Sequence, residues 1–187
     1  LPAVYSATVL MWSLAELGDF AAAAGVGEDA IRLADSVEHP YSQIFAHLGP
    51  GFLHLRRGEH ADAIGHLEQA LQICEAFDVA AVHATTAGPL ASAYAQAGRA
   101  EDALVLIRRT VAQAAVIGDP IGHGVRTGTR AEALLAAGRP AEALPLARRG
   151  LDLVRLIRGR GIEGWSLRLL GEVDAAQDPP LLDEARA

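Results

Sequence analysis

The chain has 187 residues, of which 51% are hydrophobic and only 5% aromatic. It contains 38 alanines and 25 leucines, and all 16 basic residues are arginine. With its periodic apolar positions, this composition is typical of packed helices and excludes a disordered chain, a collagen-like repeat and a disulfide-stapled domain. The single cysteine, Cys74, cannot form an internal disulfide, so a hydrophobic core must hold the fold together.

Charge and hydropathy narrow the possible partners. The net charge is −7, with residues 1–98 at −8 and residues 99–187 at +1. Because an acidic surface repels a polyanion, we expect no nucleic-acid partner. No apolar run approaches the roughly 18–20 residues of a membrane span, so we expect no membrane partner and a cytoplasmic location. The first residues lack an initiator Met and the basic segment of a signal peptide, which we interpret as a piece of a longer protein.

A turn segment recurs every 40 residues. Its glycines are Gly18, Gly58, Gly98 and Gly138, and each is followed five residues later by an alanine. Glycine is the natural residue after a helix end, because it adopts positive φ without a Cβ clash. The period predicts a single domain over 1–187, with repeats at about 1–40, 41–80, 81–120 and 121–160 and a partial repeat over 161–187.

Two helices are expected in each repeat, with apolar residues spaced by three and four, as in Ala63, Leu67, Ala70 and Cys74. Short turns make each pair an antiparallel hairpin, and hairpins stacked in register predict an all-α, right-handed α-solenoid. Proline after Asp119 predicts a capped helix start at that point. The first helices are predicted at 3–17, 41–57, 81–97, 121–137 and 161–176, and the second helices at 20–37, 60–77, 100–117 and 140–157.

The third repeat fits the tetratricopeptide (TPR) pattern of apolar, small and aromatic positions through Leu90, Ala91, Tyr94, Ala103 and Ile107. The chain therefore resembles TPR proteins. HEAT and armadillo repeats of about 40–47 residues stay an alternative, although they do not require the recurring glycine turn. The second and fourth repeats supply further matches at Gly51, Ala63, Leu67 and Ala70, and at Ala131, Leu134, Ala143 and Ala147.

Three segments resemble more particular proteins: residues 51–59, residues 164–172 and Asp178-Pro179-Pro180. They are similar to the C-terminal repeat tails of large bacterial signalling proteins, which carry a STAND/AAA-type ATPase and a nucleotide-cyclase-like or DNA-binding domain upstream. This resemblance implies a non-catalytic tail that binds a partner or a sister domain. It carries over no catalytic residue and no cofactor. The residues themselves also bring no nucleophile, base and orienting group together, so we predict that the chain is not an enzyme.

The resemblance to TPR stacks implies that the first helices line a concave groove for a peptide, a protein or another domain of the same chain. Aromatic and arginine side chains anchor many interfaces. An alternative is that Phe45, Phe52 and Trp165 simply pack between neighbouring helices. Counted from the turn glycines, the candidate groove residues are Trp12, Phe45, Phe52, Arg56, Gln96, Glu132, Trp165 and Arg168.

Equivalent positions on the second helices are acidic in the first two repeats and basic in the third and fourth. This polarity predicts self-association or an acidic partner, and an ordinary solvated surface is the alternative. The acidic positions are Glu28-Asp29 and Glu68, and the basic ones are Arg108-Arg109 and Arg148-Arg149.

Other site chemistry is weak. His47 and His54 share a helix face, but no HExxH motif, paired cysteines or carboxylate cluster accompanies them, so we predict no metal site. Residues 122–128 are glycine-rich, but the spacing of their glycines does not fit a nucleotide-binding loop. Cys74 lies on the apolar stripe of its helix, so we expect a buried structural thiol. Proline within the helices predicted at 41–57 and 81–97 suggests kinks. A small-molecule pocket between these two helices is therefore an alternative function.

Overall fold

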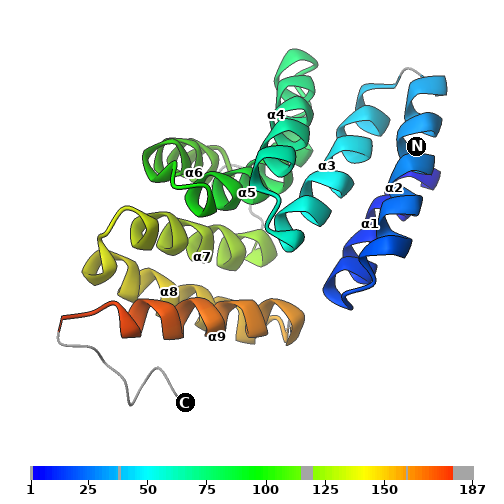
Figure 1. The fold of residues 1–187 in the computed structure, drawn as a ribbon. Helices are drawn as coiled ribbons and strands as arrows, with labels where there is room; N and C mark the ends of the chain where they lie inside the picture. The colour runs from blue at the N-terminus through cyan, green and yellow to red at the C-terminus, as the bar shows by residue number, and fades with distance from the viewer. Residues whose placement is uncertain (1, 38, 115–119, 159, 179–187) are drawn as a thin grey trace. The chain divides into compact units, whose positions relative to one another are not determined.

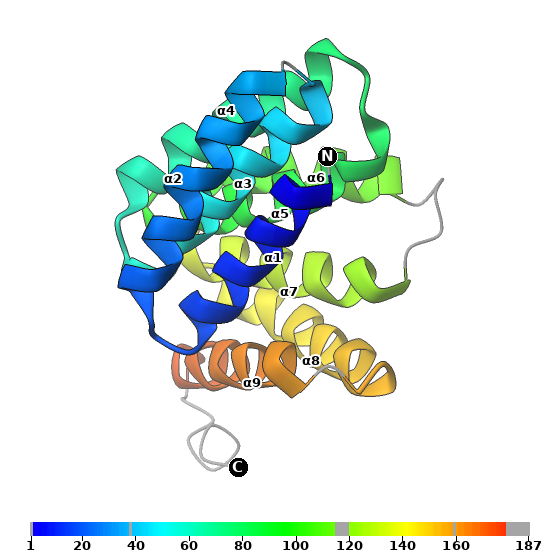
Figure 2. The ribbon, with the colours of Figure 1, turned by 90° about the vertical axis from the view of Figure 1, so that its right-hand side faces the viewer.

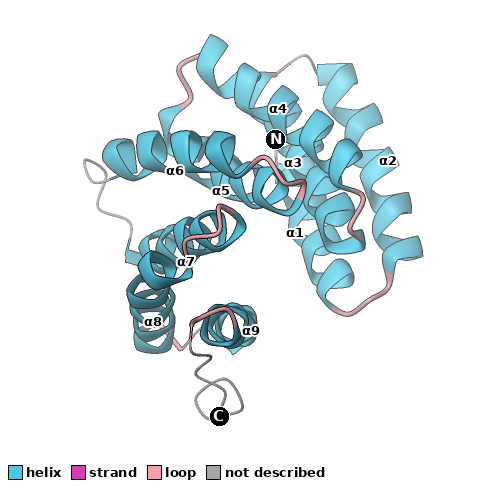
Figure 3. Cartoon of the chain, turned by 60° about the vertical axis from the view of Figure 1, so that its left-hand side comes forward, coloured by secondary structure: helices cyan, strands magenta, loops and turns pink. Residues whose placement is uncertain are grey.

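A computed structural model describes residues 2–37, 39–114, 120–158 and 160–178 of the chain. These residues form nine α-helices joined by short loops and contain no strand (Figures 1 and 3). The fold is therefore all-α, as predicted. The helices are α1 (Pro2–Glu16), α2 (Phe20–Val37), α3 (Pro40–Arg57), α4 (His60–Ala76), α5 (Ala80–Gln96), α6 (Ala100–Ala114), α7 (Pro120–Ala136), α8 (Pro140–Leu156) and α9 (Arg160–Ala175).

The predicted helix ends agree with these bounds to within one residue, except at the end of α6. There the prediction reached residue 117, and residues 115–119 lie outside the described part of the chain. The predicted cap at Asp119 and the partial repeat beyond residue 178 also lie outside it.

The four repeat glycines end their helices as predicted. Gly18, Gly58, Gly98 and Gly138 have φ between 69° and 80°, a region that glycine enters without a Cβ clash. Each turn is closed by a hydrogen bond from the residue after the glycine to a carbonyl five residues back, as in Glu59 N to His54 O at 2.9 Å. This is the Schellman pattern, which satisfies the carbonyls left open at a helix end. The same closed turn therefore recurs at a period of 40 residues.

The chain divides into two compact units, residues 1–93 and 94–187, and the boundary lies within α5. In the first unit, α1 packs against α2 and α3, α2 packs against α3, and α3 packs against α4 (Figure 2). In the second unit, α7 packs against α6, α8 and α9, and α8 packs against α9. Each unit is therefore built of antiparallel hairpins in which a first helix contacts its own second helix and the first helix of the next repeat. The single-domain expectation stays a prediction.

The Gly-Pro-Gly segment of α3 is explained by close packing. The helix runs without interruption through Pro50, and both flanking glycines are buried. A Cβ on Gly49 would lie 2.8 Å from the Met11 sulfur, and a Cβ on Gly51 would lie 2.6 Å from Leu67 Cγ. Side chains of α1 and α4 thus fill the space that the glycines leave. At α3, this packing accounts for the glycines without a ligand pocket.

The core is made of small and branched apolar side chains. The alanines and leucines assigned to the repeat pattern, including Ala63, Leu67, Ala143 and Ala147, are at most 4% exposed. The thiol of Cys74 is 2% exposed, as predicted for a buried cysteine, and its sulfur lies 3.8 Å from the Thr86 hydroxyl. Within the described residues, no helix is both long enough and apolar enough to span a membrane.

Candidate functional site

The first unit gathers three of the predicted groove residues, together with Glu16, at the surface of α1 and α3. The Trp12 and Phe52 rings lie 5.5 Å apart, and the Arg56 guanidinium lies 4.4 Å from the Phe52 ring centre. Arg56 Nε also donates to Glu16 Oε1 at 2.8 Å. We call Trp12, Glu16, Phe52 and Arg56 the N-terminal cluster. It presents two partly exposed aromatic rings and an arginine held in place by a carboxylate.

The N-terminal cluster packs on the hydrophobic core. Phe52 packs against the buried group formed by Met11, Ala15, Ala23 and Leu53. The side chain of Arg56 is 18% exposed and that of Glu16 is 40% exposed, so the ion pair lies at the border of solvent. A planar guanidinium over an aromatic face is attracted by the ring quadrupole. The arginine is therefore positioned from two directions and needs little further ordering on binding.

Phe45 is a correction to the predicted set. Its side chain is 4% exposed and lies between the rings of Tyr5 at 5.1 Å and Tyr41 at 5.4 Å. Its carbonyl accepts a hydrogen bond from the Thr8 hydroxyl at 2.8 Å, which ties α1 to α3. Phe45 is therefore a core residue, as the packing alternative proposed, and cannot offer a contact surface.

The second unit holds the remaining predicted residues in two groups. Gln96 Nε2 at the end of α5 donates to Glu132 Oε1 on α7 at 2.8 Å. On α9, the Arg168 guanidinium lies 5.0 Å from the Trp165 ring centre, and Arg168 also pairs with Glu172. Trp165 is 37% exposed. We call Trp165, Arg168 and Glu172 the C-terminal cluster, which combines the same three chemical types as the N-terminal cluster.

Exposed charges on the second helices follow the predicted change of sign. Glu28 and Asp29 on α2 are exposed and both pair with Arg32. Arg148 on α8 is exposed and lies 4.0 Å from Asp174, whose side chain is buried. These charges are partly compensated within the chain.

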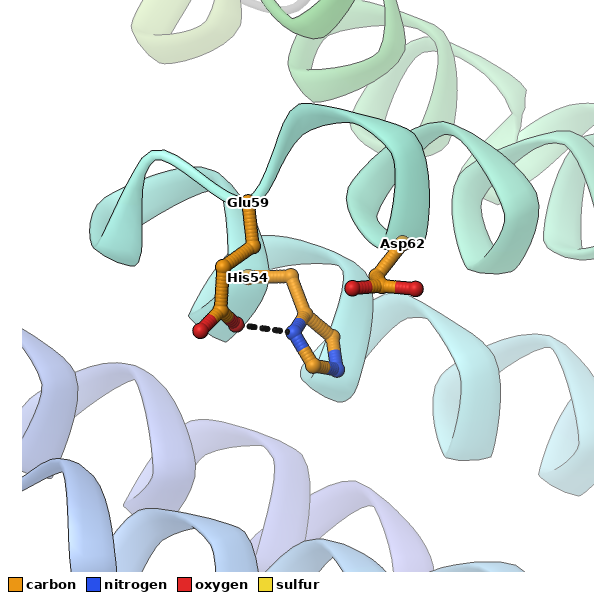
Figure 4. Close-up of side chains that lie close together, drawn as sticks. All are labelled: His54, Glu59 and Asp62. Carbon is orange, nitrogen blue, oxygen red and sulfur yellow. Dashed lines mark hydrogen bonds and ion pairs between the residues drawn. The ribbon is translucent and has the colours of Figure 1, made fainter.

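A histidine–carboxylate cluster joins α3 to α4, and the sequence prediction missed it. His54 Nδ1 lies 2.6 Å from Glu59 Oε2, and one ligand atom each of His54, Glu59 and Asp62 lies within 4.8 Å of the other two (Figure 4). The expectation that no carboxylates accompany the histidines was therefore wrong. A better signal was the presence of His54 in the last turn of α3 and two acids just after Gly58, because a tight turn brings such residues together.

Two more histidines extend this cluster along the interface of α3 and α4. The His66 ring stacks parallel to His54 at 5.6 Å, and His66 Nδ1 lies 3.2 Å from His47 Nδ1. Burial and the nearby His66 lower the pKa of His47, although Asp35 opposes the shift. Burial and the nearby His54 likewise lower the pKa of His66 against the opposing effect of Asp62. Both rings therefore favour the neutral form in the folded chain.

These arrangements define a class: a helical-hairpin repeat protein with aromatic–arginine clusters on its first helices. The tetratricopeptide repeat family model matches residues 84–109 and 126–149, so TPR repeats are present in the third and fourth predicted repeats. No curated protein sequence matches the chain.

Two solved structures share the fold. One is the crystal structure of nearly identical TPR-like repeats from a Podosopora anserina protein described as a kinesin light chain, with 19% identity and a TM-score of 0.70. That match covers 100% of this chain and 95% of the other. A point variant of the same repeats matches with 20% identity and a TM-score of 0.69, covering 97% and 92% of the two chains. This similarity establishes a solenoid-type fold of TPR-like hairpins.

Proposed function

We propose that the chain is a non-catalytic protein-binding module whose first helices capture a peptide or a neighbouring protein domain. TPR repeats generally mediate protein–protein interaction. The observation that carries the proposal is the N-terminal cluster, where Arg56 is fixed between Phe52 and Glu16 beside the ring of Trp12. Tryptophan, tyrosine and arginine are the residues most enriched at binding hot spots.

The chemistry of the cluster indicates the kind of segment that fits. The two rings offer apolar contact area, while Arg56 and Glu16 offer one donor group and one acceptor group. A peptide with an apolar side chain and an accessible backbone carbonyl therefore matches the cluster. The C-terminal cluster and the Gln96–Glu132 pair supply the corresponding contacts of the second unit.

We further infer that the module is the sensor or partner-binding tail of a larger bacterial signalling ATPase. The segments at 51–59, 164–172 and 178–180 support this through their resemblance to such tails. Reading the encoding gene in frame on both sides of the chain tests it. An upstream ATPase domain would support the inference, and measured ATPase activity should then change when the repeats are removed. A gene that encodes the repeats alone would contradict it.

Peptide selection tests the binding function itself. A displayed library of random peptides is panned on the purified chain, and the selected peptide is synthesised and titrated by calorimetry. The double variant Phe52→Ala/Arg56→Ala should lose at least about tenfold in affinity while the helical circular dichroism signal is kept. Arg149→Ala removes an exposed arginine from α8 and is the matched control. Equal affinity of the double variant and the control would refute binding at the N-terminal cluster.

The two alternatives have distinct outcomes in other assays. A small-molecule sensor would show a ligand-dependent rise in melting temperature without any selected peptide. A self-assembly module would show a mass that increases with protein concentration at low salt, because the attraction between its acidic and basic helices is screened by salt.

A further inference from the structure

The histidine–carboxylate cluster brings together metal-ligand side chains that the proposed protein-binding function does not use. His54 lies in the last turn of α3, Glu59 precedes α4, and Asp62 lies in its first turn. Figure 4 shows the three side chains gathered around the turn that joins the two helices. The three ligand atoms already lie within 4.8 Å of one another. In a tetrahedral zinc site with bonds of about 2.0–2.2 Å, ligand atoms are about 3.3 Å apart, so small side-chain rotations suffice.

The donor set selects among metal ions. One imidazole nitrogen with two carboxylate oxygens suits Zn²⁺ and neighbouring first-row transition metals. Ca²⁺ and Mg²⁺ prefer an all-oxygen shell, and Ca²⁺ takes six to eight oxygens. The set of His54, Glu59 and Asp62 is therefore a poor match for either.

Surrounding groups hold two of the donors in place. The parallel ring of His66 supports the His54 ring at 5.6 Å. Arg57 Nη2 binds Glu59 Oε1 at 2.7 Å, which leaves Oε2 directed at His54. Groups that orient ligands in this way favour metal binding, although the positive charge of Arg57 itself opposes a cation. Arg57 also offsets part of the carboxylate charge, so the set with neutral histidine carries a net charge near −1.

The cluster is also accessible to an ion. The His54 side chain is 24% exposed, that of Glu59 is 34% exposed, and Asp62 is exposed. An ion can therefore enter from solvent, and water can complete its coordination. Such a site differs from a closed structural zinc site, in which four protein ligands surround the metal.

We propose that His54, Glu59 and Asp62 bind one divalent transition-metal ion of the Zn²⁺ type at the turn between α3 and α4. The bound ion links the end of α3 to the start of α4 across Gly58. It thereby stabilises the hairpin that carries Phe52 and Arg56. Metal occupancy is a property of this hairpin alone, so the proposal stands or falls separately from peptide binding.

Calorimetry with Zn²⁺ tests the proposal on the chain without a polyhistidine tag, after treatment with a chelator. We expect saturation at one ion per chain and a higher melting temperature with Zn²⁺, because an ion that binds only the folded state stabilises it. Mg²⁺ and Ca²⁺ at the same concentrations should have no effect on the melting temperature. Co²⁺ should give a visible absorption band that Zn²⁺ displaces.

Variants identify the ligands. His54→Gln and Glu59→Gln should each lower Zn²⁺ affinity by at least about tenfold. Asp62→Asn changes an exposed residue and should do the same with the fold intact, so it keeps the test decisive if another variant unfolds. His123→Gln, which changes an exposed histidine on α7, is the matched control. The proposal is overturned if the untagged chain shows no saturable heat with Zn²⁺. Unchanged affinity in Asp62→Asn, or loss of binding in His123→Gln, also overturns it.

Discussion

Replacing Gly51 by alanine should destabilise the chain, although alanine is the better helix former. A Cβ at this position would lie 2.6 Å from Leu67 Cγ and 2.8 Å from Leu67 Cδ2. Cγ is the branch point of a fully buried leucine, so it cannot swing aside. Overpacking of a core costs about 1–3 kcal/mol, and the helix preference for alanine returns about 1 kcal/mol. The expected net loss in the free energy of unfolding is about 1 kcal/mol.

Gly65→Ala provides the matched comparison. Gly65 is an exposed helical glycine on α4, and a Cβ there meets nothing within 4 Å. This variant should be more stable than the parent by about 0.5–1 kcal/mol, because alanine loses less backbone entropy on folding. In urea unfolding followed by circular dichroism, the free energies of unfolding of the two variants should differ by about 2 kcal/mol, with the same dependence on urea concentration. If Gly51→Ala is as stable as Gly65→Ala, the close approach of α3 and α4 described above is wrong.

Three further predictions concern titration, reactivity and an ion pair. The pKa values of His47 and His66 are lowered in the folded state, so the unfolded chain binds more protons in the pH range between the lowered values and the unfolded value of about 6.5. The urea midpoint should therefore fall as the pH decreases from about 7.5 through the lowered pKa values. The double variant His47→Gln/His66→Gln should flatten this pH dependence, whereas the control His39→Gln, at an exposed histidine, should leave it unchanged. A midpoint that rises on acidification would contradict the prediction. Burial raises the pKa of the Cys74 thiol, so a disulfide reagent should modify it far more slowly in the native chain than in guanidinium chloride, and equal rates would show that the thiol is accessible. A double-mutant cycle with Glu16→Gln and Arg56→Ala should give a coupling energy of about 0.5–1 kcal/mol in urea unfolding, whereas a value of zero would mean that the pair is not formed in solution.

The sequence was sufficient to predict the helices, because their ends are set by local chemistry. Gly18, Gly58, Gly98 and Gly138 end their helices through a backbone conformation that other residues resist. The small residues of the repeat pattern, such as Ala63 and Ala103, are fully buried, as close helix crossings require. The first feature is local to the turn, and the second follows from the repeat, because equivalent small positions recur where the helices of each hairpin cross.

The surface residues were harder to predict, because burial at one repeat position depends on its neighbours. Phe45 and Trp165 are three repeats apart at equivalent positions, yet they are 4% and 37% exposed. Tyr5 and Tyr41 cover the first ring, whereas the second lies under an arginine guanidinium. The repeat period fixes the position of a side chain on its helix, but the neighbours that decide its exposure differ from repeat to repeat.

The histidine–carboxylate cluster escaped the sequence analysis for a related reason. Glu59 and Asp62 lie between Gly58 and Ala63, within the recurring turn segment, and not on the helix face that carries His47 and His54. Their proximity to His54 is created by the reversal at Gly58, which brings residues five and eight positions apart to one place. A search for ligands across each predicted turn, and not along single helices, would have found the set.

The chain contains two tryptophans, and they allow the most direct test of the proposed binding surface. Trp12 belongs to the N-terminal cluster and Trp165 to the C-terminal cluster, so their fluorescence reports on both. A selected tryptophan-free peptide is titrated into the parent chain and into the Trp12→Phe and Trp165→Phe variants. We predict a saturable change of emission that gives the same dissociation constant as calorimetry. At least one of the two tryptophans should be the source of this change. Peptide binding by calorimetry with no emission change from either tryptophan would contradict binding at the first helices.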